Sequence, residues 1–153
     1  MSRKLFALIG CSKKKSTTNP FHEMVPARDL YCSDLFKKRV EHIESRGLPW
    51  FILSAKCGCI SPGTPLRKYD HTILDKEPID RAAWHIGAAS QLIDSLYYDF
   101  GIRDPAECVI EIHAGRDYCE TLRKILQIAG FEVERPVEGM GIGQQLAYYS
   151  KGS

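Results

Sequence analysis

The stretch WFILSAKCGCISPGTPLRKYDHTIL, residues 50–74, changes abruptly from an apolar run to a polar loop. Its opening residues, Trp50 to Leu53, are large and apolar, which is typical of a short buried strand. Residues 54–70 are rich in Gly and Pro and exceed the usual connection length of about 4–6 residues. Long loops often carry function, because a rigid scaffold positions their side chains. We expect this loop to contribute to a site, with an ordinary solvated surface loop as the alternative.

Three further apolar runs are typical of strands, at residues 4–9, 108–113 and 131–135. Helical spacing predicts a helix from Pro26 to the end signal at Gly47, which a second N-cap at Ser33 would divide. A helix between Asp117 and Gly130 and a short terminal helix through Tyr149 are also expected. The clearest helix covers residues 78–99, and its buried stripe is expected to contain Ile79, Ala83, Ile86, Ala89, Ile93 and Leu96.

Alternation of strands and helices implies crossover connections and a parallel sheet covered on both faces. We therefore predict a single α/β domain over residues 1–153. It is expected to have three layers, with a mainly parallel sheet of about four strands flanked by helices.

Composition is ordinary for a globular protein, with 44% hydrophobic and 26% charged residues and a net charge of +2. The first apolar stretch is too short for a signal peptide, and no run approaches the roughly 20 residues of a membrane span. A cytoplasmic protein without a membrane partner is expected. The six cysteines are expected to be reduced, and none has zinc spacing, so neither a metal nor a cofactor is predicted.

Polar or glycine-rich segments follow every predicted strand, and ligands bind beyond the carboxyl ends of parallel strands. Four segments should therefore meet at one edge of the sheet, at residues 11–13, 54–56, 113–118 and 138–143. The predicted ligand-binding residues are Cys11, Ser12, Lys13, Arg28, Tyr31, Ser54, Tyr69, His113, Gly115, Arg116, Tyr118, Gly139, Gly141 and Gly143.

Each motif has a structural alternative. The segment from Gly10 to Lys13 could bind phosphate, but it lacks P-loop spacing. The glycines of residues 139–143 could hold an anion at a helix N-terminus or permit a tight turn. Cys11 could be a nucleophile or a buried thiol. His113 could be a base or a structural histidine at the end of a strand.

Five sequence motifs occur along the chain in the order IGCSKKK, PARDLYCSDLF, SPGTPLRKYDHTI, HAGRDY and EGMGIG. Together they resemble a family of small bacterial and phage proteins of unknown function, over nearly the whole chain. The SAK-x-G and Tyr-Asp region is also similar to the YaaA family of peroxide-stress proteins, whose members have been linked to DNA binding. The opening pattern is similar to a domain of archaeosine-type tRNA-modifying enzymes. The family pattern has an aromatic residue or His at position 57 and Leu at 59, where this chain has Cys57 and Cys59.

These resemblances imply nucleic-acid or nucleobase chemistry. The first hypothesis is an enzyme that acts on a nucleotide or nucleic acid, with cleavage or exchange of an N-glycosidic bond as its reaction. Asp70 or Glu138 would stabilise an oxocarbenium-like centre or activate water. The alternatives are a DNA- or RNA-binding module and a small-molecule phosphate binder. The expected catalytic residues are Asp70, Glu138 and Lys56; the phosphate-binding residues are Lys13, Arg28, Lys56 and Arg116; and the base-stacking residues are Tyr31, Tyr69 and Tyr118.

Overall fold

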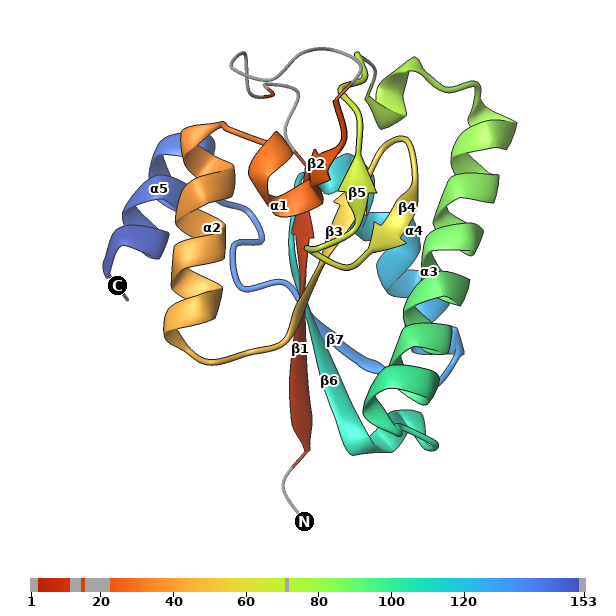
Figure 1. Cartoon of the computed structure of the whole chain (residues 1–153). Helices are drawn as coiled ribbons and strands as arrows, with labels where there is room; N and C mark the ends of the chain where they lie inside the picture. The colour runs from red at the N-terminus through yellow and green to blue at the C-terminus, as the bar shows by residue number, and fades with distance from the viewer. Residues whose placement is uncertain (1–2, 12–14, 16–22, 71, 152–153) are drawn as a thin grey trace.

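A computed structural model describes residues 3–11, 15, 23–70 and 72–151 of the chain, with a twisted sheet at its centre (Figure 1). The strands are β1 (Lys4–Gly10), β3 (Trp50–Ser54), β4 (Gly58–Ile60), β6 (Cys108–His113) and β7 (Glu132–Glu134). Their order in the sheet is β4-β3-β1-β6-β7, and every neighbouring pair is parallel except β3 and β4. The mainly parallel α/β sheet is thus confirmed, with one strand more than expected because β4 forms within the predicted loop.

Helices cover both faces of the sheet (Figure 1). Helices α3 (Pro78–Phe100) and α4 (Arg116–Ile128) pack on one face, and α1 (Ala27–Leu30), α2 (Asp34–Ser45) and α5 (Ile142–Lys151) lie on the other. Alternating residues of β1 supply the two cores, because successive side chains of a strand point to opposite faces. Phe6 and Leu8 join the core under α3 and α4, whereas Ala7 and Ile9 join the core under α1 and α2.

The expected division of the first helical segment is observed. The side chain of Ser33 accepts a hydrogen bond of 3.2 Å from the backbone N–H of Phe36, so α2 begins with a fresh N-cap. Tyr31, between α1 and α2, has extended backbone angles. The helix ends at Arg46 and Gly47, where the glycine has a φ of 68°.

Helix α3 faces the core with only the second half of the expected stripe: Ala89 and Leu96 are buried and Ile93 packs against the core, whereas Ala83 is exposed. Ile79 and Ile86 are 79% and 61% exposed. The indole N–H of Trp84 donates a 2.8 Å hydrogen bond to the carbonyl oxygen of Ser54, and the ring is buried. This large side chain sets the rotation of the helix. The buried positions are Trp84, His85, Ala88, Ala89, Leu92 and Leu96.

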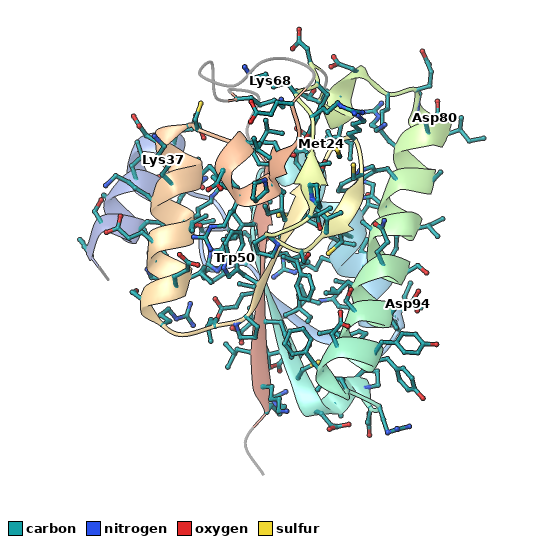
Figure 2. The ribbon with its side chains drawn as sticks, in the orientation of Figure 1. Met24, Lys37, Trp50, Lys68, Asp80 and Asp94 are labelled. Carbon is teal, nitrogen blue, oxygen red and sulfur yellow. The ribbon has the colours of Figure 1, made fainter. Side chains whose placement is uncertain are left out.

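A second, two-stranded sheet pairs β2 (Val25–Pro26) with β5 (Pro65–Leu66) in antiparallel fashion. Further backbone hydrogen bonds run from Ala27 to Thr64, at 2.8 Å, and from Arg28 to Pro62, at 2.9 Å. The pairing brings Met24 and Lys68 to the same region of the molecule (Figure 2). The loop after β3 is therefore folded back over the sheet instead of extending into solvent.

The ends of β1 and β6 lie against each other. A Cβ atom added to Gly10 would be 2.8 Å from the Cβ of Ala114 and 3.1 Å from its Cα, so only glycine fits at this position. The chain passes from β1 to β3 on one side and later places β6 on the other side. The sheet reverses its strand order at this point, which is where α/β folds of this type bind ligands. No helix within the described residues is long and apolar enough to cross a bilayer.

Candidate functional site

Three hydroxyl groups from distant parts of the sequence meet just beyond the end of β3. The phenol oxygens of Tyr31 and Tyr69 are 2.6 Å apart. The Ser54 hydroxyl lies 3.3 Å from the oxygen of Tyr31 and 3.1 Å from that of Tyr69. Ser54 also accepts a 3.2 Å hydrogen bond from the backbone N–H of Cys57, which holds the turn after the strand. All three hydroxyl groups belong to residues predicted from the sequence to bind ligand.

A thiol and a third phenol extend this group towards β1 and α4. The sulfur of Cys11 lies 3.5 Å from the phenol oxygen of Tyr118. Both side chains pack against the core that contains Tyr31 and Tyr69. We call Cys11, Tyr31, Ser54, Tyr69 and Tyr118 the hydroxyl–thiol cluster.

Two residues that were not predicted complete the surroundings of the cluster. The ammonium of Lys15 lies 4.3 Å from the ring centre of Tyr69 and 5.8 Å from that of Tyr31, within cation–π range. The indole of Trp84 packs edge-on against Tyr118, with ring centres 5.4 Å apart. Lys15 lies in a segment without hydrophobic periodicity. Trp84 lies outside the face of the helix at residues 78–99 that was predicted to be buried, so the sequence pattern indicated neither residue.

Burial raises the pKa of each phenol in the cluster, and proximity to Cys11 raises it further. The pKa shifts of Tyr31, Tyr69 and Tyr118 therefore all keep the phenols protonated at neutral pH. Protonated phenols donate hydrogen bonds, and they can protonate a leaving group only as weak acids. The cluster is thus suited to hold an oxygen or nitrogen acceptor and is not suited to act as a base.

The three expected catalytic residues all lie on the surface. Asp70 follows the buried Tyr69 directly in the chain and is exposed. Lys56 is exposed and, with Trp84, lines a cavity of about 310 Å³ between α3 and β4. Glu138 forms a 3.1 Å ion pair with Arg123 and is 61% exposed.

Several expected ligand-binding residues lie apart from the cluster. Arg28 forms a bidentate ion pair with Glu44, at 2.9 Å for both hydrogen bonds, beside a cavity of about 490 Å³ that Tyr31 also lines. Arg116 pairs with Glu120 at 2.8 Å and lines a cavity between the first turns of α3 and α4. The glycine residues at 115, 139, 141 and 143 are exposed. Ser12 and Lys13 lie outside the described residues.

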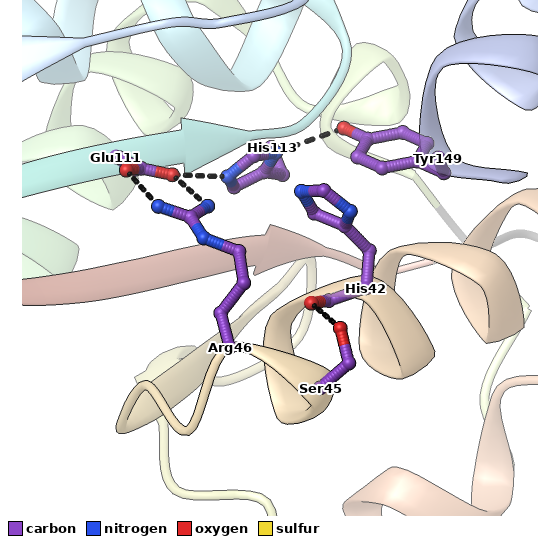
Figure 3. A network of polar contacts seen from close by, with 6 residues as sticks. All are labelled: His42, Ser45, Arg46, Glu111, His113 and Tyr149. Atoms are coloured by element: carbon purple, nitrogen blue, oxygen red, sulfur yellow. Dashed lines mark hydrogen bonds and ion pairs between the residues drawn. The ribbon is translucent and has the colours of Figure 1, made fainter. Parts of the chain in front are cut away.

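His113 belongs to a buried network on the face of the sheet that α2 and α5 cover, outside the hydroxyl–thiol cluster (Figure 3). Its Nε2 lies 2.9 Å from a carboxylate oxygen of Glu111, and its Nδ1 lies 2.9 Å from the hydroxyl of Tyr149. Arg46 donates two hydrogen bonds of 2.8 Å to the same carboxylate. Burial by itself would raise the pKa of Glu111, but the hydrogen bonds from Arg46 and His113 lower it to about 2.

Burial lowers the pKa of His113, against the opposing effect of Glu111. A neutral His113 must donate from Nε2 to the ionised Glu111 and accept at Nδ1 from Tyr149. The imidazole is completely buried, so the network fastens α5 to the sheet. This arrangement corresponds to the structural alternative for His113.

Arg39 is a buried charge that the sequence-based predictions do not include. It is only 5% exposed, and it donates a 2.8 Å hydrogen bond to the side-chain oxygen of Gln145 on α5. A signal was present in the sequence, since Arg39 lies between Phe36 and Ile43 on the buried face of α2. An arginine among the apolar residues of an amphipathic helix indicates a buried partner or a buried site.

Within the described residues, no group of three or more His, Cys, Asp or Glu side chains is arranged to hold a metal ion. The cysteines there are free. No curated protein and no solved structure matches the chain significantly. The family model described as "Family of unknown function (DUF6884)" matches residues 6–151. This match includes β1 from Phe6 onward, the other four strands of the central sheet and every residue of the hydroxyl–thiol cluster, and the chain belongs to that family.

Proposed function

We propose that the protein is an enzyme that acts on a nucleotide or a nucleic acid, and that its site is the hydroxyl–thiol cluster at the carboxyl edge of the sheet. The observation that supports this proposal is the meeting of Tyr31, Ser54 and Tyr69 within 3.3 Å of one another. Three polar groups from separate segments converge next to the strand ends, where α/β folds bind ligands.

The cluster supplies hydrogen-bond donors and aromatic faces together. The phenols stay protonated and can donate to a ring nitrogen or a carbonyl oxygen of a base. Lys15 lies over the ring of Tyr69 and brings a positive charge to the same place. Nucleobases combine a flat π-face with acceptor atoms at the edge, so they match this combination.

The proposed reaction is hydrolysis of the N-glycosidic bond. The bond between the sugar C1′ and the base nitrogen breaks, and its electron pair leaves with the base. A water molecule adds its oxygen to C1′ and gives up one proton, while the base takes up one proton. Asp70 would stabilise the positive charge at C1′ or accept the proton of the water, because it follows Tyr69 directly.

Mass spectrometry tests this proposal directly. The protein is incubated with pooled nucleotides, DNA and tRNA, and release of a free base is the expected result. The Tyr69→Phe variant should release it more slowly. Tyr98→Phe is the matched control, because Tyr98 is 79% exposed on α3. Absence of any product with all three substrates would contradict the proposal.

A nucleic-acid-binding module is the second candidate. The specific observation in its favour is that the hydroxyl–thiol cluster contains no carboxylate and that Asp70 is exposed. Binding without turnover, detected by fluorescence anisotropy with labelled DNA and RNA, would favour this candidate. Its affinity should fall steeply with salt concentration, as phosphate contacts require.

A further inference from the structure

Arg39 carries a charge in the protein interior that no carboxylate balances. All Asp and Glu residues of the chain fall among the described residues. None of them forms an ion pair with Arg39. Glu111 is the only buried carboxylate in the described part of the chain, and it is paired with Arg46. A buried charge is unfavourable unless it is both paired and hydrogen-bonded.

Only some of the hydrogen-bond donors of Arg39 have a partner among the described residues. Besides Gln145, it hydrogen-bonds to the hydroxyl of Tyr149, and its Nε is buried without a partner among the described residues. Burial lowers the pKa of Arg39, and the charge of Arg135 contributes to the lowering. Arg135 is half-buried, and its Nε is likewise buried without a partner among the described residues.

Both guanidinium groups reach the strand ends at which the sheet reverses its order. A terminal nitrogen of Arg39 would lie 3.8 Å from a Cβ at Gly10, the last residue of β1. Arg135 donates a 3.1 Å hydrogen bond to the carbonyl oxygen of Ala114, directly after β6. Gly10 and Ala114 are in contact, so the two arginines approach the same point from different elements.

We propose that Arg39 and Arg135 form a subsite for a phosphate group at the junction of the ends of β1 and β6. Guanidinium groups bind phosphate oxygens in a bidentate manner, and two of them match the charge of a phosphate ester. This subsite extends the proposed function, and its assignment to the phosphate of a nucleotide rests on that function. It places the phosphate near Cys11, the first residue of the hydroxyl–thiol cluster after β1.

Gln145 connects this subsite to the glycine-rich segment. Its oxygen accepts from Arg39, and its amide N–H donates a 3.0 Å hydrogen bond to the carbonyl oxygen of Met140. The segment that the sequence associated with anion binding is thus held by the residue that orients Arg39. A purely structural role would instead use Arg39 only to attach α5 to α2, through Gln145 and Tyr149.

Replacement of Arg39 by methionine separates the two roles. Arg39→Met removes the charge and keeps much of the apolar stem. Calorimetric titration with inorganic pyrophosphate is expected to show binding to the wild type and at least about tenfold weaker binding to Arg39→Met. In phosphate-free buffer, the melting temperature of this variant should equal or exceed that of the wild type, because an unbalanced buried charge has been removed.

Lys37→Met is the matched control, because it removes a positive charge from an exposed position of the same helix. It should retain wild-type pyrophosphate affinity. Wild-type affinity in Arg39→Met, or no pyrophosphate binding to the wild type, would overturn the subsite. A lower melting temperature of Arg39→Met with unchanged affinity would assign Arg39 a structural role. If Arg39→Met does not fold, Arg135→Met carries the same test with the same expected loss of affinity.

The same titration distinguishes the subsite from the proposed function. Tyr69→Phe should bind pyrophosphate like the wild type, because Tyr69 belongs to the other part of the site. Pyrophosphate binding without release of any base from nucleotides or nucleic acids would leave the subsite intact and contradict only the enzyme proposal.

Discussion

The phenol oxygens of Tyr31 and Tyr69 lie 2.6 Å apart, although 38 positions separate the two residues in the chain. Their contact joins the segment before α2 to the end of the loop that follows β3. Both hydroxyls also meet Ser54, so the loop is fastened to the strand from which it departs. The fold-back of Tyr69 that makes this loop useful for a site depends on these buried hydrogen bonds.

Tyr69→Phe should therefore affect stability as well as activity. The change removes one hydroxyl from the buried triangle and leaves the others with fewer partners. We expect the free energy of unfolding to fall by about 1–2 kcal/mol, the usual cost of losing such a hydrogen bond. Urea denaturation measures it. The exposed control Tyr98→Phe should stay within about 0.5 kcal/mol of the wild type, and an equal loss in both variants would contradict the prediction.

Asp70→Asn tests the proposed chemistry. The substitution keeps the size of the side chain and removes its charge. If Asp70 assists cleavage, the variant should bind its ligand normally and release base at least about 100-fold more slowly. Single-turnover kinetics with an equilibrium binding assay separate the two effects. Asp99→Asn, an exposed change near the end of α3, serves as the control. Unchanged turnover in Asp70→Asn would make Glu138 the next candidate.

Glu111→Gln should destabilise the fold strongly. The carboxylate receives two hydrogen bonds from Arg46 and one from His113, and its removal leaves Arg46 without a counter-charge. We expect a loss of about 2–3 kcal/mol, below the range for fully buried pairs because Arg46 is 35% exposed. Chemical denaturation at pH 7 measures this loss. The surface change Glu120→Gln, in a pair that is 61% exposed at the carboxylate, should have little effect.

Stability should decrease below neutral pH. Burial lowers the pKa of His42 and of His113, and the charge of Arg46 lowers that of His42 further. In the unfolded chain, histidine titrates near about pH 6.5. As the pH falls, the unfolded state therefore takes up protons before the folded state does. The contribution of these histidines to the free energy of unfolding is fully present above about pH 6.5 and is lost as the pH falls below it.

His42→Leu should reduce this pH dependence. Both ring nitrogens of His42 are buried without a hydrogen-bond partner among the described residues, so an apolar side chain can take its place. Unfolding free energies at pH 7.5, 6.5 and 5.5 give the slope. Lys124→Gln, an exposed change on α4, should leave the slope unchanged. A slope in His42→Leu as steep as in the wild type would exclude His42 as a contributor.

The junction between β1 and β6 offers a test of packing. Gly10→Ala should cost about 1–3 kcal/mol, because its new Cβ would lie 2.8 Å from the Cβ of Ala114. Combining it with Ala114→Gly should recover part of the loss, measured by thermal unfolding. No recovery would show that the backbone of Ala114, 3.1 Å from the new Cβ, limits the space instead.

The sequence by itself determined the class of the fold. Apolar runs at residues 4–9, 50–53 and 108–113 mark strands that are buried on both faces, and helical periods between them require parallel connections. The edge of the sheet at which polar residues gather follows from this topology. Cys11, Ser54, Tyr69 and Tyr118 could be selected because each lies close to a strand end or in the unusual loop, and Tyr31 because its ring could stack a base.

Tertiary structure decided which polar residues meet. Hydrophobic periodicity predicts the buried face of a helix only approximately. In α3 the buried, hydrogen-bonded Trp84 turns towards the sheet a face that differs from the one predicted from the isoleucines. The sequence also could not give His113 its role, since that depends on Tyr149 from α5 and, through the neighbouring Glu111, on Arg46 at the end of α2. Only the tertiary structure showed that no carboxylate among the described residues pairs with Arg39, and the cost of a buried charge depends on such neighbours and not on its position in the chain.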